Sequence, residues 1–169
     1  TCVSPRADHR HQADDEDRYA PSPDQREAEH DGCQKREQER AASSAQFPFL
    51  MPAEGDISRG FDERQYHYGI DFAGKPGSAV LAAAGGNIVF SGWTYDDGFT
   101  MIIAHGQGYM TVYKHNQALL RITGTPVRRG EVVAFLGNTG KTSSGPHLHF
   151  EVWKDGIAQD PTNYLLSIQ

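Results

Sequence analysis

Three short patterns in the second half of the chain combine residue types that bind metals and transfer protons. His67 and Asp71 are four residues apart, His147 and His149 are two apart, and His115 follows a strand-like run. His67, Asp71 and His149 together offer two nitrogens and one oxygen, a set suited to tetrahedral zinc with one position left for water. Zinc lowers the pKa of water and polarises a carbonyl, and His115 and His147 remain for proton transfer and oxyanion stabilisation.

These patterns need extended backbone to work. In a strand, alternation sends His147 and His149 to one face and Leu148 to the other, and two imidazoles on one face must be paired, solvated or bound to something. A strand through His67 and Asp71 would also put both side chains on one face, although this spacing alone is a weak signal. A further histidine, His105, precedes a glycine turn, and we expect it at a turn or rim.

The elements that would carry these residues are short strands separated by glycine turns. The chain has 18 glycines, and Val, Ile, Phe and Tyr occur in short runs. We expect an antiparallel, mainly β fold, with one short helix over residues 116–120. The predicted strands are Asn87–Trp93, Phe99–His105, Met110–Lys114, Glu131–Leu136 and His147–Trp153.

Composition divides the 169 residues into two parts. Residues 1–46 contain no Leu, Ile, Met, Phe or Trp and many charges, so they cannot bury enough apolar surface to offset chain entropy. We predict a disordered tether there, with its best helical chance over residues 25–42, and a folded domain over residues 47–169. The tether is interpreted as a spacer, with a partner-binding arm as the alternative.

Several protein classes are excluded by the same numbers. No apolar run approaches the ~20 residues of a membrane span. The net charge of −6 argues against a protein that binds duplex nucleic acid, and two cysteines exclude a disulfide-dense scaffold. We expect no signal peptide in the chain as given. Cys2 suits a lipid anchor, a Cys2–Cys33 disulfide or a plain thiol, and all three readings stay open.

The motifs together resemble one family. His67-Tyr-Gly-Ile-Asp71-Phe72, Tyr113-Lys-His115 and the run Gly137 to Glu151 (GNTGKTSSGPHLHFE) occur in the order of the lysostaphin/LytM-type zinc metallopeptidases, peptidase family M23. These are bacterial peptidoglycan endopeptidases. The resemblance extends over essentially all of residues 47–165.

The resemblance implies a fold, a site and a substrate. The fold is a folded antiparallel β-sheet of the lysostaphin-like, duplicated hybrid motif type with a groove for a peptide. The zinc ligands fall on His67, Asp71 and His149, and the catalytic histidines on His115 and His147. We therefore expect one Zn²⁺ per chain and a monomer in the bacterial cell envelope, either periplasmic, an outer-membrane lipoprotein or secreted. Its substrate is a peptide bond in peptidoglycan.

Some features depart from the family or stay open. Residues 58–64 differ from the commoner family pattern, so the near wall of the groove and any tyrosine that assists the oxyanion are not assigned. Tyr66, Tyr68, Tyr95 and Tyr109 are the possible neighbours. Links from D-Ala to diaminopimelate, from D-Ala to Lys, and polyglycine bridges are all possible substrates. The alternative function is a non-catalytic module that binds peptidoglycan or activates an amidase.

Overall fold

The computed structural model describes residues 47–166, and the statements below concern that part of the chain. The predicted tether, its possible helix and both cysteines lie outside the described residues. The expected boundary at Phe47 therefore stays a prediction. Among the described residues, no helix is both long and apolar enough to cross a membrane.

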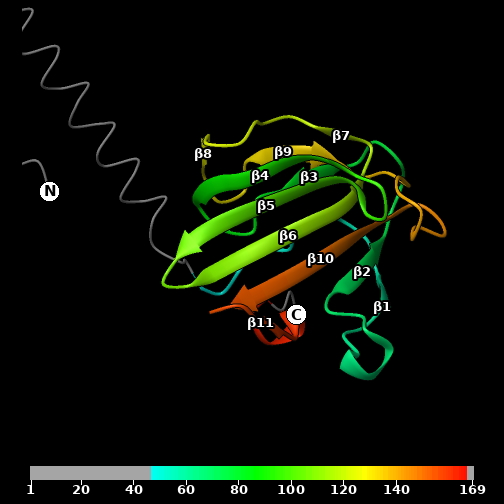
Figure 1. Ribbon diagram of the computed structural model, residues 1–169, viewed down its shortest axis with the longest axis horizontal. Helices are drawn as coiled ribbons and strands as arrows, with labels where there is room; N and C mark the ends of the chain where they lie inside the picture. Colours follow the sequence, from blue (N-terminus) through cyan, green and yellow to red (C-terminus); the bar gives the residue numbers. More distant parts are fainter. Residues whose placement is uncertain (1–46, 167–169) are drawn as a thin grey trace, which may run out of the picture. The chain divides into compact units, whose positions relative to one another are not determined.

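An antiparallel sheet of eight strands forms the main body of the fold (Figure 1). Seven strands lie in the order β1-β2-β10-β6-β5-β4-β8, and β11 pairs with β10. The bounds are β1 Ile57–Arg59, β2 Ile70–Ala73, β4 Gly86–Thr94, β5 Gly98–Gly106, β6 Tyr109–Asn116, β8 Pro126–Val127, β10 His147–Lys154 and β11 Ile157–Gln159.

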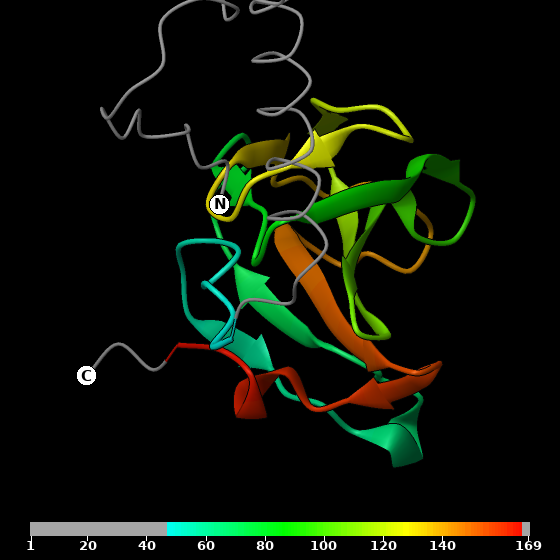
Figure 2. The same cartoon turned by 90° about the vertical axis from the view of Figure 1, so that its left-hand side faces the viewer.

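A second, smaller sheet has the order β3-β9-β7, with β3 at Ala79–Leu81, β9 at Val132–Phe135 and β7 at Ala118–Leu119. Two short 3₁₀ helices complete the described elements, η2 at Glu63–Gln65 and η3 at Pro161–Asn163. In Figure 2, β9 of the second sheet lies in the upper part of the view, and β11 and η3 lie in the lower part. The mainly β, antiparallel fold predicted from the sequence is confirmed.

The five predicted strands correspond to β4, β5, β6, β9 and β10, but the predicted helix at residues 116–120 is wrong. That segment contains β7 instead. Its flanking amides donate to the neighbouring strand, from Gln117 N to Phe135 O at 2.7 Å and from Leu120 N to Val133 O at 2.8 Å. A helix would lose these bonds, so pairing with a distant strand overrides the weak local preference.

Alternation along the central strands gives the large sheet two different faces. Leu148, Phe150 and Val152 of β10 point into the apolar core together with Tyr113 of β6, and all four are fully buried. The residues between Leu148, Phe150 and Val152 project from the opposite face. The packing of one face thus fixes which way the histidines of β10 must point.

Candidate metal centre and its surroundings

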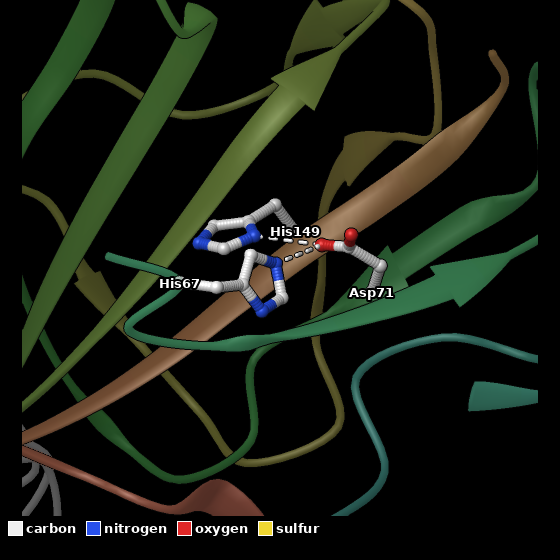
Figure 3. Close-up of side chains that lie close together, drawn as sticks. All are labelled: His67, Asp71 and His149. Carbon is white, nitrogen blue, oxygen red and sulfur yellow. Dashed lines mark hydrogen bonds and ion pairs between the residues drawn. The ribbon is translucent and has the colours of Figure 1, made fainter. Parts of the chain in front are cut away.

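Three side chains from two separate segments of the chain meet on the outer face of the large sheet (Figure 3). Their potential ligand atoms, one each from His67, Asp71 and His149, all lie within 4.8 Å of one another. Asp71 Oδ1 is 3.1 Å from His67 Nε2 and 2.7 Å from His149 Nδ1. All three residues are buried to more than nine-tenths. The structure thus brings together the three residues that the sequence singled out for zinc.

Strand register accounts for two of these positions. Asp71 of β2 and His149 of β10 are directly paired in the antiparallel ladder. Residues paired in this way project from the same face with their Cβ atoms about 5 Å apart. The pairing of two strands 78 residues apart therefore creates the contact.

His67 reaches the site in another way than the sequence suggested. It lies outside β2, in an isolated bridge with Asp62, so one extended strand through His67 and Asp71 is not what brings these side chains together. Asp62 caps η2, and Tyr66 ends that helix in the left-handed conformation with φ 56°. The loop thereby turns back and aims the imidazole at Asp71.

Each ligand imidazole lies between two hydrogen-bond acceptors. His67 Nδ1 is 2.7 Å from Gly60 O, and His149 Nε2 is 3.0 Å from Glu151 Oε1. These outer nitrogens must carry hydrogens, because carbonyl and carboxylate oxygens only accept. Without an ion, His149 also donates from Nδ1 to Asp71, and when both rings are neutral, as metal binding requires, the inner nitrogens carry lone pairs that face Asp71. Three electron-pair donors facing one another are suited to a shared cation.

Glu151 was not singled out in the sequence as a site residue, yet it is central to the site. Its Oε1 lies 2.8 Å from Lys114 Nζ, and its Oε2 accepts from Trp153 Nε1 at 2.6 Å. Burial alone would raise the pKa of Glu151, but hydrogen bonds from His149 and Lys114 lower it to about 2. Glu151 is therefore an anion that orients His149. The only signal for Glu151 in the sequence was its position two residues after His149, which puts both side chains on the same face of a strand.

The cluster also shifts the pKa values of Asp71 and His149. Burial tends to raise the pKa of Asp71, but the hydrogen bond and charge of His149 outweigh it and lower that pKa. For His149, burial tends to lower the pKa, but its bonds to Asp71 and Glu151 raise it. Asp71 is thus held as a carboxylate, the form that binds cations.

His115 and His147 lie beside the cluster, with ring centroids 4.8 Å apart. His115 Nδ1 lies 2.9 Å from Thr139 O, and His147 Nδ1 lies 2.7 Å from Gly145 O. Because a carbonyl accepts, each Nδ1 must donate, and each neutral ring keeps its lone pair on Nε2. Burial lowers the pKa of His115, which favours this neutral form.

A polar pocket of about 240 Å³ joins these residues. Of the four tyrosines named as possible neighbours, Tyr66 and Tyr68 line it, whereas Tyr95 and Tyr109 are absent from its lining. The rest of the lining is Arg59, Gln65, His67, Asp71, Asp97, Lys114, His115, Thr142, His147, His149 and Glu151. An adjoining hollow of about 520 Å³ shares Asp97, Lys114 and Glu151 with it and is otherwise mostly apolar.

The expectation for His105 is wrong. His105 is fully buried rather than at a rim, and it lies within β5. Its Nδ1 lies 2.8 Å from Gly85 O and its Nε2 2.7 Å from Thr111 Oγ1. Burial lowers the pKa of His105 to about 4. A backbone carbonyl and a threonine hydroxyl on the core side thus provide hydrogen-bond partners for a histidine that the sequence predicted at a turn or rim.

Comparison with known sequences gives a consistent result. The family described as Peptidase family M23 matches residues 65–161. The chain is 41% identical over 100 residues to the DD-carboxypeptidase/endopeptidase Mpg of Neisseria meningitidis, covering 59% of this chain and 23% of the relative. It is 34% identical over 116 residues to the murein hydrolase activator NlpD of Escherichia coli, covering 68% and 30%. The chain thus spans less than a third of the length of these relatives.

Solved structures are similar as well. A zinc-containing peptidase from Vibrio cholerae superposes with a TM-score of 0.65 at 30% identity, covering 68% of this chain and 39% of that one. The catalytic domain of lysostaphin from Staphylococcus simulans gives a TM-score of 0.56 at 30% identity, covering 66% and 87%. The curved antiparallel sheet that carries the cluster is therefore shared with known peptidases.

Proposed function

The chain belongs to peptidase family M23, and we propose that it is a zinc metalloendopeptidase that hydrolyses peptide bonds in the stem or cross-bridge peptides of bacterial peptidoglycan. The observation that carries the proposal is the convergence of His67, Asp71 and His149, with two further histidines in the same pocket. Five groups suited to metal binding and proton transfer thus line one pocket.

The donor set fits zinc. His67 Nε2, Asp71 Oδ1 and His149 Nδ1 would hold the ion, and each imidazole has its other nitrogen bonded to an acceptor, as is usual for metal-binding histidines. When bound, zinc supplies Lewis acidity that polarises a carbonyl and lowers the pKa of water. Glu151 fixes the ring of His149, and the carbonyl of Gly60 fixes the ring of His67.

His115 and His147 carry the proton transfers in this proposal. With Nδ1 donating to a backbone carbonyl, Nε2 of one histidine takes the proton of the attacking water. The other histidine, protonated on both ring nitrogens, donates from Nε2 to the oxyanion or to the leaving amine, while the first ring keeps the proton of the water, so the pair as a whole gains one proton and gives up one. The lowered pKa of His115 keeps this ring neutral near pH 7, so it is ready to accept a proton.

The site of action follows from the substrate. We propose that the protein works in the bacterial cell envelope, because peptidoglycan lies there. We also propose that it acts as a monomer. The similarity to a relative named as a lipoprotein supports an envelope location. Lipid attachment at Cys2 belongs to the same proposal, as one of the readings that the sequence left open.

A second candidate function is a non-catalytic activator of another murein hydrolase. It is supported by the 34% identity to the activator NlpD over 68% of the chain. Such a protein would bind peptidoglycan or a partner enzyme without cleaving it. All three proposed metal ligands and both proposed catalytic histidines are present in one pocket, which favours an enzyme over a non-catalytic activator.

The test compares His149→Ala with His115→Ala. The purified wild-type protein should contain about one zinc per chain and release dye from labelled peptidoglycan in a chelator-sensitive way. His149→Ala should lose both zinc and release, whereas His115→Ala should keep zinc and lose release. Equal zinc loss in the two variants would refute the division of roles. Wild-type protein that releases nothing but stimulates a murein hydrolase would establish the activator instead.

A further inference from the structure

One cation of the polar pocket has no assigned role. Arg59 is the last residue of β1, lines the pocket and is exposed. In the β1–β2 ladder it is paired with Asp71. The register of this ladder shifts between Ile57 and Arg59, and Arg59 lines the same pocket as Asp71, so its side chain is on the face that carries the proposed metal ligands.

The other cation of the pocket is already neutralised. Lys114 Nζ lies 2.8 Å from Glu151 Oε1 and 3.3 Å from Asp97 Oδ2. Burial alone would lower the pKa of Lys114, but its pairing with those two carboxylates raises it. Lys114 is therefore not available to attract an anionic substrate group.

Arg59 differs, because within residues 47–166 it forms no ion pair. Asp62, an acid of the same wall, is engaged by local bonds: it accepts from Arg64 N at 3.0 Å and from Gln65 Nε2 at 2.8 Å. A guanidinium stays charged at any working pH and presents a planar fork of donors that matches a carboxylate. The pocket thus offers one available carboxylate-binding group, at the side of Asp71.

We propose that Arg59 determines specificity by binding a substrate carboxylate next to the scissile bond. This inference rests on the proposed function, since it concerns the substrate of the same site. Arg59 and Asp71 line the same pocket of about 240 Å³ and are paired in the β1–β2 ladder, so a carboxylate bound by Arg59 lies close to a bond held at the proposed metal site. The carboxylate therefore belongs to the residue that contributes one side of the scissile amide.

This chemistry separates the three bonds that the sequence left open. In a link from D-Ala to diaminopimelate, the carbon that bears the scissile nitrogen also carries a carboxylate. The corresponding carbon is a methylene in a link to lysine, and an internal glycine bridge has no free carboxylate. Arg59 therefore selects the diaminopimelate type of cross-link.

The experiment uses two synthetic peptides that differ in one group. Both contain a D-alanyl link to diaminopimelate, with a carboxylate beside the scissile nitrogen in one and a carboxamide in the other. For the zinc-loaded wild-type protein, kcat/KM should be about tenfold higher for the carboxylate peptide, as expected for a charge-assisted bond. Arg59→Met should remove the preference, and Arg59→Lys should keep part of it.

A neighbouring arginine supplies the matched control. Arg64 belongs to the same wall but does not line the pocket, so Arg64→Met should keep the full preference. The preference of the wild type should also decline with added salt, because Arg59 is exposed. A wild type that cleaves both peptides equally, or an Arg59→Met variant with an unchanged preference, would overturn the inference.

A binding measurement separates this failure from that of the proposed function. The Kd of each peptide is measured by calorimetry for wild type and Arg59→Met. Tighter binding of the carboxylate peptide by the wild type alone, without cleavage, would support the role of Arg59 and refute the peptidase. Cleavage of both peptides without any difference in Kd or kcat/KM would support the peptidase and refute the role of Arg59.

Discussion

At the scale of single residues, the site depends on which nitrogen of each imidazole carries a hydrogen. Gly60 O and Glu151 Oε1 hold the outer nitrogens of His67 and His149, and the inner nitrogens face Asp71. A metal site needs such partners, because an imidazole that can rotate or exchange its proton binds a cation less well. The acceptors therefore matter nearly as much as the ligands.

Glu151 provides the sharpest test of this idea. Glu151→Leu leaves the Nε2 hydrogen of His149 without its acceptor and should weaken zinc binding by roughly 10- to 100-fold. Glu151→Gln keeps an oxygen acceptor and should lose much less. Competition with a chromogenic chelator measures both constants. If the two variants bind zinc as tightly as the wild type does, Glu151 has no positioning role.

His105 makes the folded state sensitive to acid. Its pKa is lowered to about 4 in the folded state, below the ordinary 6.5, so between these values the unfolded chain binds the extra proton. Its contribution to stability is complete above pH 6.5, is lost as the pH falls toward 4, and amounts to about 3 kcal/mol at most.

The measurement is urea unfolding between pH 4 and pH 7, with chelator present so that metal release does not contribute. His105→Gln cannot titrate, and its stability should change less with pH than that of the wild type. The difference between the two curves isolates His105. Parallel curves for the two proteins would contradict the assignment.

At the scale of elements, hydrogen bonds connect the start of β5 and the end of β6 to the loop that follows β9. Phe99 N donates to Thr139 Oγ1 at 3.1 Å, and Thr139 Oγ1 donates to Asn116 O at 2.6 Å. The carbonyl of the same Thr139 binds His115, which has an unusual φ of 64°. A strained backbone at a proposed catalytic residue persists only where neighbours enforce it.

Gly98 tests this connection. A Cβ at Gly98 would lie 2.2 Å from Thr139 Oγ1 and 2.5 Å from Thr139 C, and φ is +68°. Gly98→Ala must therefore shift the loop and should cost at least about 2 kcal/mol of unfolding free energy, with a loss of turnover. Denaturant unfolding and peptide cleavage measure the two effects.

Gly124 is the matched control. It also has a positive φ, +86°, but no atom lies within 4 Å of its added Cβ. Gly124→Ala should cost about 1 to 2 kcal/mol from backbone strain alone and leave turnover intact. Equal losses of stability in both variants would show that contact with Thr139 is unimportant.

At the scale of the whole described domain, folding and metal binding should depend on each other. The proposed ligands come from β10, β2 and the loop before β2, so the site forms only when distant strands pair. An ion that binds the folded state alone stabilises it by mass action. Free zinc at 100 times Kd should therefore add about 2.7 kcal/mol.

Thermal unfolding with and without zinc measures this coupling. The wild-type Tm should rise with added zinc and fall with chelator. Asp71→Asn, which removes the anionic ligand while keeping the size of the side chain, should show a much smaller rise. A Tm of the wild type that does not respond to zinc would contradict a metal site formed by folding.

The sequence by itself determined the features that depend on local pattern. Alternation at residues 147–149 predicted that both histidines share a face, and the apolar runs predicted β4, β5, β6, β9 and β10. The types and spacing of the residues, together with the family resemblance, gave the set His67, Asp71 and His149, which the structure brings together. Such features are readable because a strand repeats every two residues whatever it pairs with.

Only the tertiary structure decided the features that depend on partners far away in the chain. It turned residues 118–119 into a strand, buried His105 against Thr111, and joined Lys114 to both Glu151 and Asp97. It also left Arg59 as the available cation beside Asp71. Charge balance and burial are sums over neighbours that strand pairing brings together, and no short stretch of sequence contains those neighbours.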